Sequence, residues 1–287
     1  MKKKINIIYL LGAGRSGTTM LTTVLNNHPK IFAVGEMHQF LDYVKDNKDC
    51  SCGAFLTDCL FWSQILQEID VSKINNPEVV SFSNELEKHY NIPRHFINRV
   101  PNRSYSTIID TVFETINRKV ETPWILDSSK YIARYLLLKK NKNLNVKGIY
   151  MVRDIRGVIH SFGKNVQTPK KPLQAITYYC LINLWGELVN AFHRQVIKIR
   201  YEDFVDNPES VLKKIETHVF GEASLAPLKL KENTFDIPHI IAGNRLRSEK
   251  KIAIKKDIAW KENINRTKQI MYYILAFPFM ILNKYKV

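Results

Sequence analysis

The alternation of short β-branched runs with longer segments of helical periodicity constrains the fold most. The runs expected to be strands are Ile5–Leu10, Trp124–Leu126, Val146–Val152 and Val196–Ile199, with Ile31–Val34 as a weaker fifth. Strands separated by helical segments are typical of βαβ units and of a mostly parallel sheet. The near-continuous apolar run Ile5–Leu10 indicates a strand that is covered on both faces. We therefore predict an α/β fold of three layers, in which helices flank a central, mostly parallel sheet.

Helical periodicity covers most of the sequence between these runs. The expected helices are Thr19–Asn26, Phe61–Ile69, Pro77–Tyr90, Tyr105–Lys119, Tyr131–Lys140, Arg156–Lys164, Pro172–Phe192 and Pro208–Val219. Residues 37–122 form a long stretch between two strands, and we expect a helical insertion there. No repeat or linker divides the sequence, so we predict one domain over residues 1–287.

The charge of the chain points to an anionic partner. The 287 residues include 43 Lys and Arg against 27 Asp and Glu, a formal net charge of +16. Such an excess favours nucleic acid, an anionic membrane face or a phosphate-rich cofactor. Because 45% of the residues are hydrophobic, the composition excludes a disordered chain.

Polar and cationic residues follow four of the expected strands. Ligands of open α/β sheets bind outside the carboxyl ends of the strands. A glycine-rich loop follows the first strand, and the later strands are followed by Asp127–Lys130, Arg153–Arg156 and Arg200–Asp203. One polyanion at this edge of the sheet explains all four segments.

The glycine-rich loop has the context of a phosphate cradle. It runs from Gly12 to Thr19 between an expected strand and an expected helix. Glycines let the backbone wrap an anion, and a helix N-terminus offers unpaired N–H groups and a partial positive charge. The spacing from Gly12 to Gly17 fits the first half of a Walker A loop, but Thr18 stands where that motif has Lys. This departure opposes a nucleotide kinase or triphosphatase, which is the alternative function of such a loop.

The segment from Gly12 to Pro29, GAGRSGTTMLTTVLNNHP, resembles the sulfotransferase family, in its bacterial, tyrosylprotein and glycan branches. In that family this loop holds the 5′-phosphosulfate of 3′-phosphoadenosine 5′-phosphosulfate (PAPS). Further segments are similar to family motifs for the 3′-phosphate (Arg153 and Ser161), for the adenine (Tyr201) and for closure on the cofactor (Gly243–Arg247, with Arg245 where the family has Pro). The cofactor-binding residues that the resemblance implies are Gly12, Ala13, Gly14, Arg15, Ser16, Gly17, Thr18, Thr19, Arg153, Ser161, Tyr201, Arg245 and Arg247.

The resemblance implies a P-loop-like fold and transfer of a sulfuryl group from PAPS to a hydroxyl acceptor, leaving 3′-phosphoadenosine 5′-phosphate (PAP). No metal is expected in this reaction. We expect the insertion over residues 37–122 to wall the acceptor site. A carbohydrate or glycolipid is the first choice of acceptor, and a peptide tyrosine or a small alcohol is the second.

Three residues are the candidates for the chemistry itself. Arg15 is suited to the charge that develops on the leaving group, and Lys130 is the second cation expected there. For the base we choose Glu36, which matches the glutamate of the tyrosylprotein-type enzymes. His38 and Asp127 are its rivals. The alternative interpretations are a helix-capping anion for Glu36 and an ordinary first-turn helix residue for Lys130.

The cysteines and the ends of the chain complete the predictions. Cys50, Cys52 and Cys59 would need a fourth ligand to bind zinc, and His38 is the only nearby candidate, so we expect a reduced loop without metal. We expect the apolar run Ile270–Leu282 to be a buried terminal helix, with peripheral membrane contact as the alternative. The expected location is cytoplasmic, with the inner membrane face as a variant.

A basic nucleic-acid-binding protein is the remaining alternative, because the charge alone would fit it. The sequence shows no helix-turn-helix, zinc finger or RNA-binding sheet, so we expect no nucleic-acid partner.

Overall fold

The computed structural model describes residues 3–74, 76–93, 95, 103–164, 168–223 and 233–287. Two compact units share the chain. The first consists of residues 1–10, 19–148 and 234–252, and the second of residues 11–18, 149–233 and 253–287. The prediction of one domain stays a prediction, because β1 (Ile5–Gly12) and β4 (Leu144–Val152) each contribute to both units.

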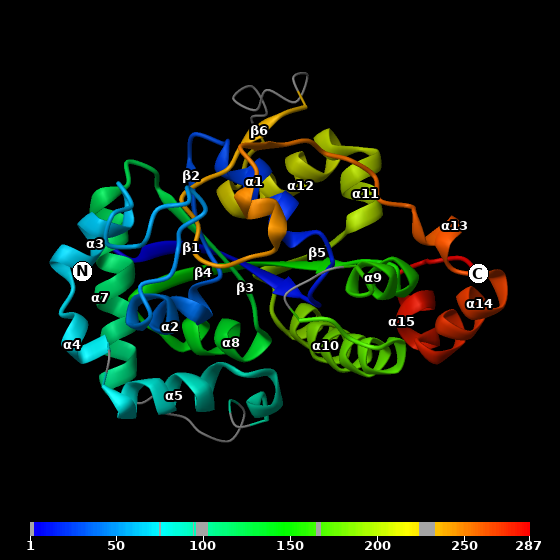
Figure 1. The fold of residues 1–287 in the computed structure, drawn as a ribbon, viewed down its shortest axis with the longest axis horizontal. Coiled ribbons are helices and arrows are strands. Elements are labelled where there is room, and N and C mark those ends of the chain that lie inside the picture. The colour runs from blue at the N-terminus through cyan, green and yellow to red at the C-terminus, as the bar shows by residue number, and fades with distance from the viewer. Residues whose placement is uncertain (1–2, 75, 94, 96–102, 165–167, 224–232) are drawn as a thin grey trace. The chain divides into compact units, whose positions relative to one another are not determined.

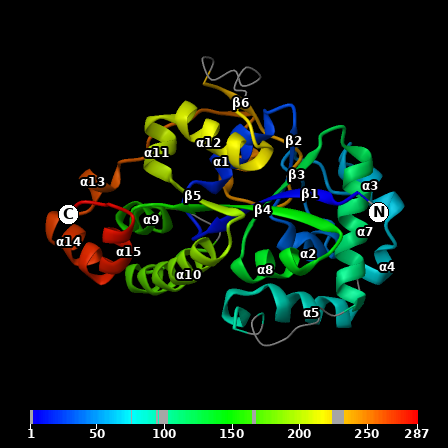
Figure 2. The same ribbon diagram turned by 180° about the vertical axis from the view of Figure 1, so that it is seen from behind.

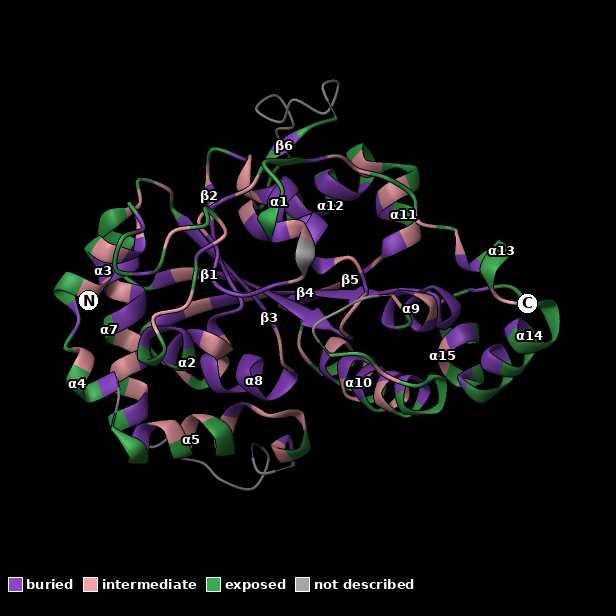
Figure 3. Cartoon of the chain, viewed as in Figure 1, coloured by how far each residue is buried: buried purple, intermediate pink, exposed green. Residues whose placement is uncertain are grey.

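A central parallel sheet of five strands confirms the predicted fold class (Figure 1). Its order is β2-β3-β1-β4-β5, with β2 over Ile31–Gly35, β3 over Trp124–Lys130 and β5 over Val196–Arg200. Most residues of the strands are buried, as Figure 3 shows, so the apolar runs are explained by helices on both faces.

The third strand is longer than its apolar run. The prediction that Asp127–Lys130 follows the strand is wrong, because these four residues belong to β3. In the parallel pair with β2, Gly35 lies opposite Asp127 after an irregularity in the register. The polar side chains inside β3 are accommodated by a buried network of hydrogen bonds described below.

The first unit contains the predicted helical insertion. Its helices include α1 (Thr18–Asn26, which begins in the loop of the second unit), α2 (Phe40–Lys45), α3 (Trp62–Glu68), α4 (Val71–Ile74), α5 (Pro77–Glu87), α7 (Arg103–Lys119) and α8 (Ile132–Lys140). Both ribbon views show α5 beside α8 (Figures 1 and 2), in agreement with the contacts between these two helices. The predicted helix Pro77–Tyr90 ends at Glu87, and a 3-10 turn follows over His89–Asn91. This unit also contains a two-stranded antiparallel sheet of β6 (Phe235–Asp236) and β7 (Lys251–Ile252).

The second unit carries the remaining helices. They are α9 (Ile155–Phe162), α10 (Pro172–Phe192), α11 (Tyr201–Asp206), α12 (Pro208–Phe220), α13 (Trp260–Asn263), α14 (Arg266–Leu275) and α15 (Phe277–Leu282). The prediction of one buried terminal helix over Ile270–Leu282 is wrong. The run divides at Ala276, just before Pro278, and many of its apolar side chains are exposed. No helix in the described ranges is both long and apolar enough to cross a membrane.

Candidate functional site

The loop after β1 needs glycine at two positions. Gly12 and Gly17 have φ angles of 139° and 90°, in the region that favours glycine. A Cβ on Gly12 would lie 2.3 Å from the carbonyl oxygen of Met151, and one on Gly17 would lie 2.5 Å from the ring of Tyr201. The backbone is therefore pressed against the end of β4 and the start of α11, and α1 begins directly after it.

Arg15 lies at the tip of this loop in a strained conformation. Its φ of 71° is rare for a residue with a side chain, and such strain is concentrated at functional sites. Its Nε donates to Oγ of Ser161, on α9, at 2.9 Å. Its carbonyl oxygen accepts a hydrogen bond from Nη1 of Arg153 at 3.1 Å. The structure thus brings together three residues that the sequence assigned to phosphate and sulfate groups.

Arg153 is buried at the end of β4, and its guanidinium is fixed on several sides. It stacks over the ring of Tyr201, with Cζ 4.2 Å from the ring centroid. Its Nη2 donates to the carbonyl oxygen of Asp257 at 3.0 Å and lies 3.3 Å from the carboxylate of the same residue. Tyr201 also accepts a hydrogen bond from the backbone N–H of Asp257 at 3.1 Å. The predicted adenine residue and the predicted 3′-phosphate residue are therefore in contact.

Three residues of this cluster were missed from the sequence. Tyr178 accepts a hydrogen bond from the N–H of Gly14 at 2.9 Å. Gly157, in the middle of α9, leaves room for Arg153, since a Cβ there would lie 2.9 Å from Nε. Asp257 also pairs with Lys164 at 3.2 Å. Burial raises the pKa of Asp257, but the charges of Arg153 and Lys164 outweigh burial and hold it below the ordinary value. A glycine inside a helix was the one signal available for these residues.

The arrangement fits a phosphate or sulfate group. The tight approaches at Gly12 and Gly17 form a cradle that any larger residue would fill. The Ser16 hydroxyl is buried, and no residue of the described ranges accepts or donates a hydrogen bond to it. Arg15 and Arg153 supply guanidinium donors, and the start of α1 supplies backbone N–H groups. Bound PAPS would thus be held by residues of the loop, by Arg153 directly after β4 and by Ser161 of α9.

The predicted closing segment lies in the first unit. The side chain of Arg245 is outside the described part of the structure. Arg247 donates from Nη2 to the carboxylate of Asp49 at 2.7 Å and from Nη1 to its carbonyl oxygen at 3.0 Å. The Arg247 guanidinium is thus bound to Asp49 within the first unit. The role of Arg247 toward the cofactor stays a prediction.

Glu36 and Lys130 form a nearly buried ion pair in the first unit. Their side chains are 9% and 16% exposed. Glu36 precedes a 3-10 turn over Met37–Gln39 but makes no side-chain capping bond there, so the interpretation as a helix-capping anion is wrong. Lys130 is the last residue of β3 rather than a first-turn helix residue, and its φ is 70°. Arg15 and Lys130, the two predicted catalytic cations, thus both have left-handed backbones.

The rival bases have other surroundings. Asp127 is fully buried, accepts from Nε of Arg134 at 3.0 Å and also binds Ser129. Arg134 in turn pairs with buried Glu87. His38 packs against Tyr131, with ring centroids 4.1 Å apart. Burial, reinforced by neighbouring cations, holds the pKa of His38 well below its ordinary value. The carboxylate of Asp127 is committed to this buried network, which opposes Asp127 as the base, and the choice of Glu36 over His38 stays a prediction.

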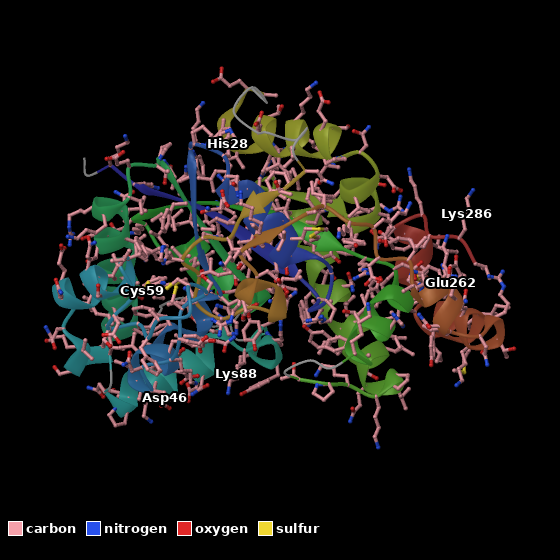
Figure 4. All side chains as sticks on the ribbon, turned by 45° about the horizontal axis from the view of Figure 1, so that its top comes forward. His28, Asp46, Cys59, Lys88, Glu262 and Lys286 are labelled. Carbon is pink, nitrogen blue, oxygen red and sulfur yellow. The ribbon has the colours of Figure 1, made fainter. Side chains whose placement is uncertain are left out.

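The three clustered cysteines meet a histidine from a distant part of the chain. One ligand atom each from Cys50, Cys52, Cys59 and His239 lies within 4.8 Å of the others. Figure 4 labels Cys59, whose side chain is buried. His38, the candidate for a fourth ligand near these cysteines in the sequence, is not part of this group, and His239 lies in that place instead.

Comparisons with known proteins identify the family and the fold. A model of the sulfotransferase family matches residues 8–220. The fold is similar to the sulfotransferase domain from the curacin biosynthetic pathway, at 18% identity and a TM-score of 0.57, over 100% of both chains. It is also similar to the sulfotransferase domain of the Synechococcus PCC 7002 olefin synthase, at 18% identity and a TM-score of 0.53, over 100% of this chain and 97% of that one. No curated protein matches the sequence. Since the family model covers most of the chain, including the glycine-rich loop, Arg153 and Ser161, the protein belongs to the sulfotransferase family.

Proposed function

We propose that this sulfotransferase uses PAPS as its donor and a hydroxyl group of a carbohydrate or glycolipid as its acceptor. The observation that carries the proposal is the contact of Arg15 with both Ser161 and Arg153 beside the glycine-rich loop. When bound, PAPS supplies an activated sulfuryl group on its 5′-phosphate. A bond from sulfur to the acceptor oxygen forms while the bond to the phosphate oxygen breaks.

The chain's own residues then have separate tasks. Arg15 and the loop N–H groups neutralise the charge that develops on the leaving phosphate oxygen. Arg153 and Ser161 hold the 3′-phosphate, and the ring of Tyr201 packs near the adenine. These assignments follow the family motifs and agree with the contacts within the second unit.

Glu36 accepts the proton of the acceptor hydroxyl in this proposal, and Lys130 orients the carboxylate through their ion pair. Gln39 supports the second carboxylate oxygen, because its Nε2 donates to Oε2 at 3.3 Å. Phe55 and Tyr90 of the insertion are 58% and 69% exposed, and such aromatic side chains suit the faces of sugar rings. This is the reason for placing a carbohydrate before a peptide tyrosine or a small alcohol.

Incubation with PAPS labelled on sulfur tests the proposal. The panel contains oligosaccharides, glycolipids, tyrosine peptides and small alcohols, and the sulfated product is detected by chromatography and mass spectrometry. Label transferred to a sugar hydroxyl supports the proposal. Transfer only to tyrosine or to small alcohols would keep the donor and overturn the acceptor class, and transfer to none of them would overturn both.

A further inference from the structure

The cysteine cluster of the first unit has the composition and spacing of a structural metal site. Cys50 and Cys59 lie 3.8 Å and 3.2 Å, through Sγ, from Nδ1 of His239. In a tetrahedral zinc site, bond lengths of about 2.3 Å to sulfur and 2.0–2.1 Å to nitrogen separate a sulfur from a nitrogen ligand by about 3.5 Å. The observed distances lie on either side of this value. We propose that Cys50, Cys52, Cys59 and His239 bind one structural zinc ion.

The backbone around the cysteines has the form of a metal-binding turn. The N–H of Gly53 donates to the carbonyl oxygen of Cys50 at 2.9 Å, and the N–H of Cys50 donates to that of Ala54 at 2.8 Å. Gly53 has a φ of 87°, which lets the chain reverse between Cys50 and Cys59. The turn places its three thiols on one side without help from a disulfide, since all of these cysteines are free.

The histidine is held in place by contacts of its own segment. Trp62, which is fully buried, donates from Nε1 to the carbonyl oxygen of His239 at 3.0 Å. Ser51 accepts from the N–H of Ile240 at 2.9 Å and donates to the carbonyl oxygen of Pro238. Both neighbours of His239 are thus tied to the residue between the first two cysteines. These contacts direct the imidazole at the thiols.

Three thiolates and one imidazole select zinc among the common divalent ions. Sulfur and nitrogen ligands in a closed tetrahedral set suit zinc, whereas magnesium and calcium require oxygen. Cys50 and Cys59 are buried and Cys52 is exposed, so the ion has a route of entry from the surface. Each thiol that binds loses its proton to solvent, and no oxidation is involved.

The zinc ion would fasten the segment that lies beside the candidate base. The N–H of Glu36 donates to the carbonyl oxygen of Ile241 at 2.8 Å, and the N–H of Ile241 donates to that of Val34 at 3.0 Å. Ile241 comes two residues after His239, so the metal joins the cysteine turn to the end of β2. The zinc site itself does not depend on the proposed function. Its role in positioning Glu36 rests on the proposal that Glu36 is the base.

Metal analysis of the purified full chain tests the site. We expect about one zinc ion per chain by mass spectrometry of metals, and a loss of at least tenfold in zinc affinity for Cys52→Ser and Cys59→Ser. Cys180→Ser is the matched control, because Cys180 lies on α10 in the second unit, and it should keep the full zinc content. Cobalt added to zinc-free wild-type protein should give the intense visible bands of a tetrahedral sulfur site.

A chelator experiment keeps the test valid if a variant folds poorly. Chelation of the wild-type protein should lower its Tm by about 5 °C or more, and added zinc should restore it. PAP should still bind after chelation, because Arg15, Arg153 and Ser161 lie in the second unit, so failure of the zinc site and failure of the donor assignment give different results. Wild-type protein with less than 0.1 zinc per chain after supply of zinc, or equal zinc loss in Cys180→Ser, would overturn the proposal.

A separate observation concerns the C-terminal helices of the second unit. Met271, Ile274, Leu275, Phe277, Ile281 and Leu282 are 46–62% exposed. On α14 the opposite face is buried through Gln269, Tyr272 and Tyr273, so Met271, Ile274 and Leu275 form one apolar face of this helix. Soluble surfaces rarely carry so many large apolar side chains together, and such patches mark interaction sites.

Basic residues flank this face. Arg266 and Lys268 are exposed in the first turn of α14, which has no acidic residue. Cations there oppose the helix dipole, so the helix itself gains nothing from them. Lys284 and Lys286 are exposed directly after α15 (Figure 4 labels Lys286). An apolar face bordered by cations complements an anionic bilayer, and we infer that α14 and α15 bind the surface of such a bilayer.

Sedimentation with vesicles tests this inference. Wild-type protein should bind vesicles of mixed zwitterionic and anionic phospholipid, at least tenfold more weakly when the anionic lipid is omitted or the salt is raised. The double variant Ile274→Glu, Ile281→Glu should lose binding, whereas Leu60→Glu, at an exposed apolar residue of the first unit, should not. Absence of binding to anionic vesicles, or a dimer in light scattering that the double variant abolishes, would overturn it.

Discussion

Arg15 donates a hydrogen bond from Nε to Oγ of Ser161 at 2.9 Å, although 146 residues separate the two in the sequence. The bond joins the tip of the glycine-rich loop to the second turn of α9. It places the residue assigned to the leaving group beside a residue assigned to the 3′-phosphate. A single bound nucleotide would therefore engage both ends of the cluster.

Replacing Arg15 by Ala should lower the rate of sulfuryl transfer from PAPS by about 100-fold or more, because no other side chain of the loop carries a charge. The Tm should fall by only about 2–4 °C, because the substitution removes the hydrogen bond to Ser161 from a partly exposed side chain and leaves the backbone strain as it is. Arg194→Ala removes an exposed charge from the same unit and serves as the control. Transfer rates are measured with labelled PAPS, and turnover within threefold of wild type would refute the assignment of Arg15.

Replacing Gly157 by Ala should weaken PAP binding, by about tenfold, because the new Cβ would displace the guanidinium of Arg153. The free energy of unfolding should rise by about 0.5–1 kcal/mol, since alanine is a better helix former than glycine. Calorimetric titration and urea unfolding separate the two effects. Gly163→Ala, at the end of α9, has no neighbour closer than 3.5 Å and should leave the affinity unchanged.

Replacing Glu36 by Gln should lower kcat by about 100-fold to 10,000-fold, as expected for loss of a general base. PAP affinity should stay within twofold, because Glu36 is assigned to the acceptor hydroxyl, whereas Arg15, Arg153 and Ser161 lie in the other unit. Glu78→Gln, an exposed residue of α5, is the control. A variant with a normal rate would move the base to His38.

Replacing Arg134 by Met should destabilise the first unit by about 3–5 kcal/mol, because it leaves Asp127 and Glu87 buried without their cation. The exposed pair of Lys213 and Glu209 provides the contrast, and Lys213→Met should cost less than about 1 kcal/mol. Both free energies of unfolding come from urea titration followed by circular dichroism. Similar losses in the two variants would show that the buried network contributes no special stability.

The sequence predicted the elements that carry a local pattern. The apolar run of β1 and the loop from Gly12 to Gly17 follow from periodicity and glycine spacing, and the structure confirms the strand and the positive φ angles of the two glycines. Helices also occur between Phe40 and Lys119, where the sequence predicts a helical insertion. These features depend on residues close to one another in the chain. The ion pair of Glu36 with Lys130 was not predicted, because Lys130 was expected after β3 and is the last residue of that strand.

Other features depend on distant residues that have no pattern of their own. His239 lies 180 residues from Cys59, so no sequence pattern near the cysteines predicts it as the fourth ligand. The polar residues at the end of β3 looked like a loop, because their partner Arg134 lies outside the strand. The sequence predicts a buried helix over Ile270–Leu282, where many apolar side chains are exposed, because apolar periodicity alone does not show whether another element covers the apolar face.

Calorimetric titration of the wild-type protein and of Arg153→Ala with PAP and with adenosine 5′-phosphosulfate tests the donor assignment most directly. Wild-type protein should bind PAP without magnesium and more tightly than ATP with magnesium. Arg153→Ala should lose about 10-fold to 100-fold in affinity for PAP, because charge-assisted hydrogen bonds to the 3′-phosphate are removed. Adenosine 5′-phosphosulfate lacks that phosphate, so the affinity of Arg153→Ala for this compound should fall less than threefold. Equal losses for the two nucleotides, or no binding of PAP by the wild type, would contradict the account.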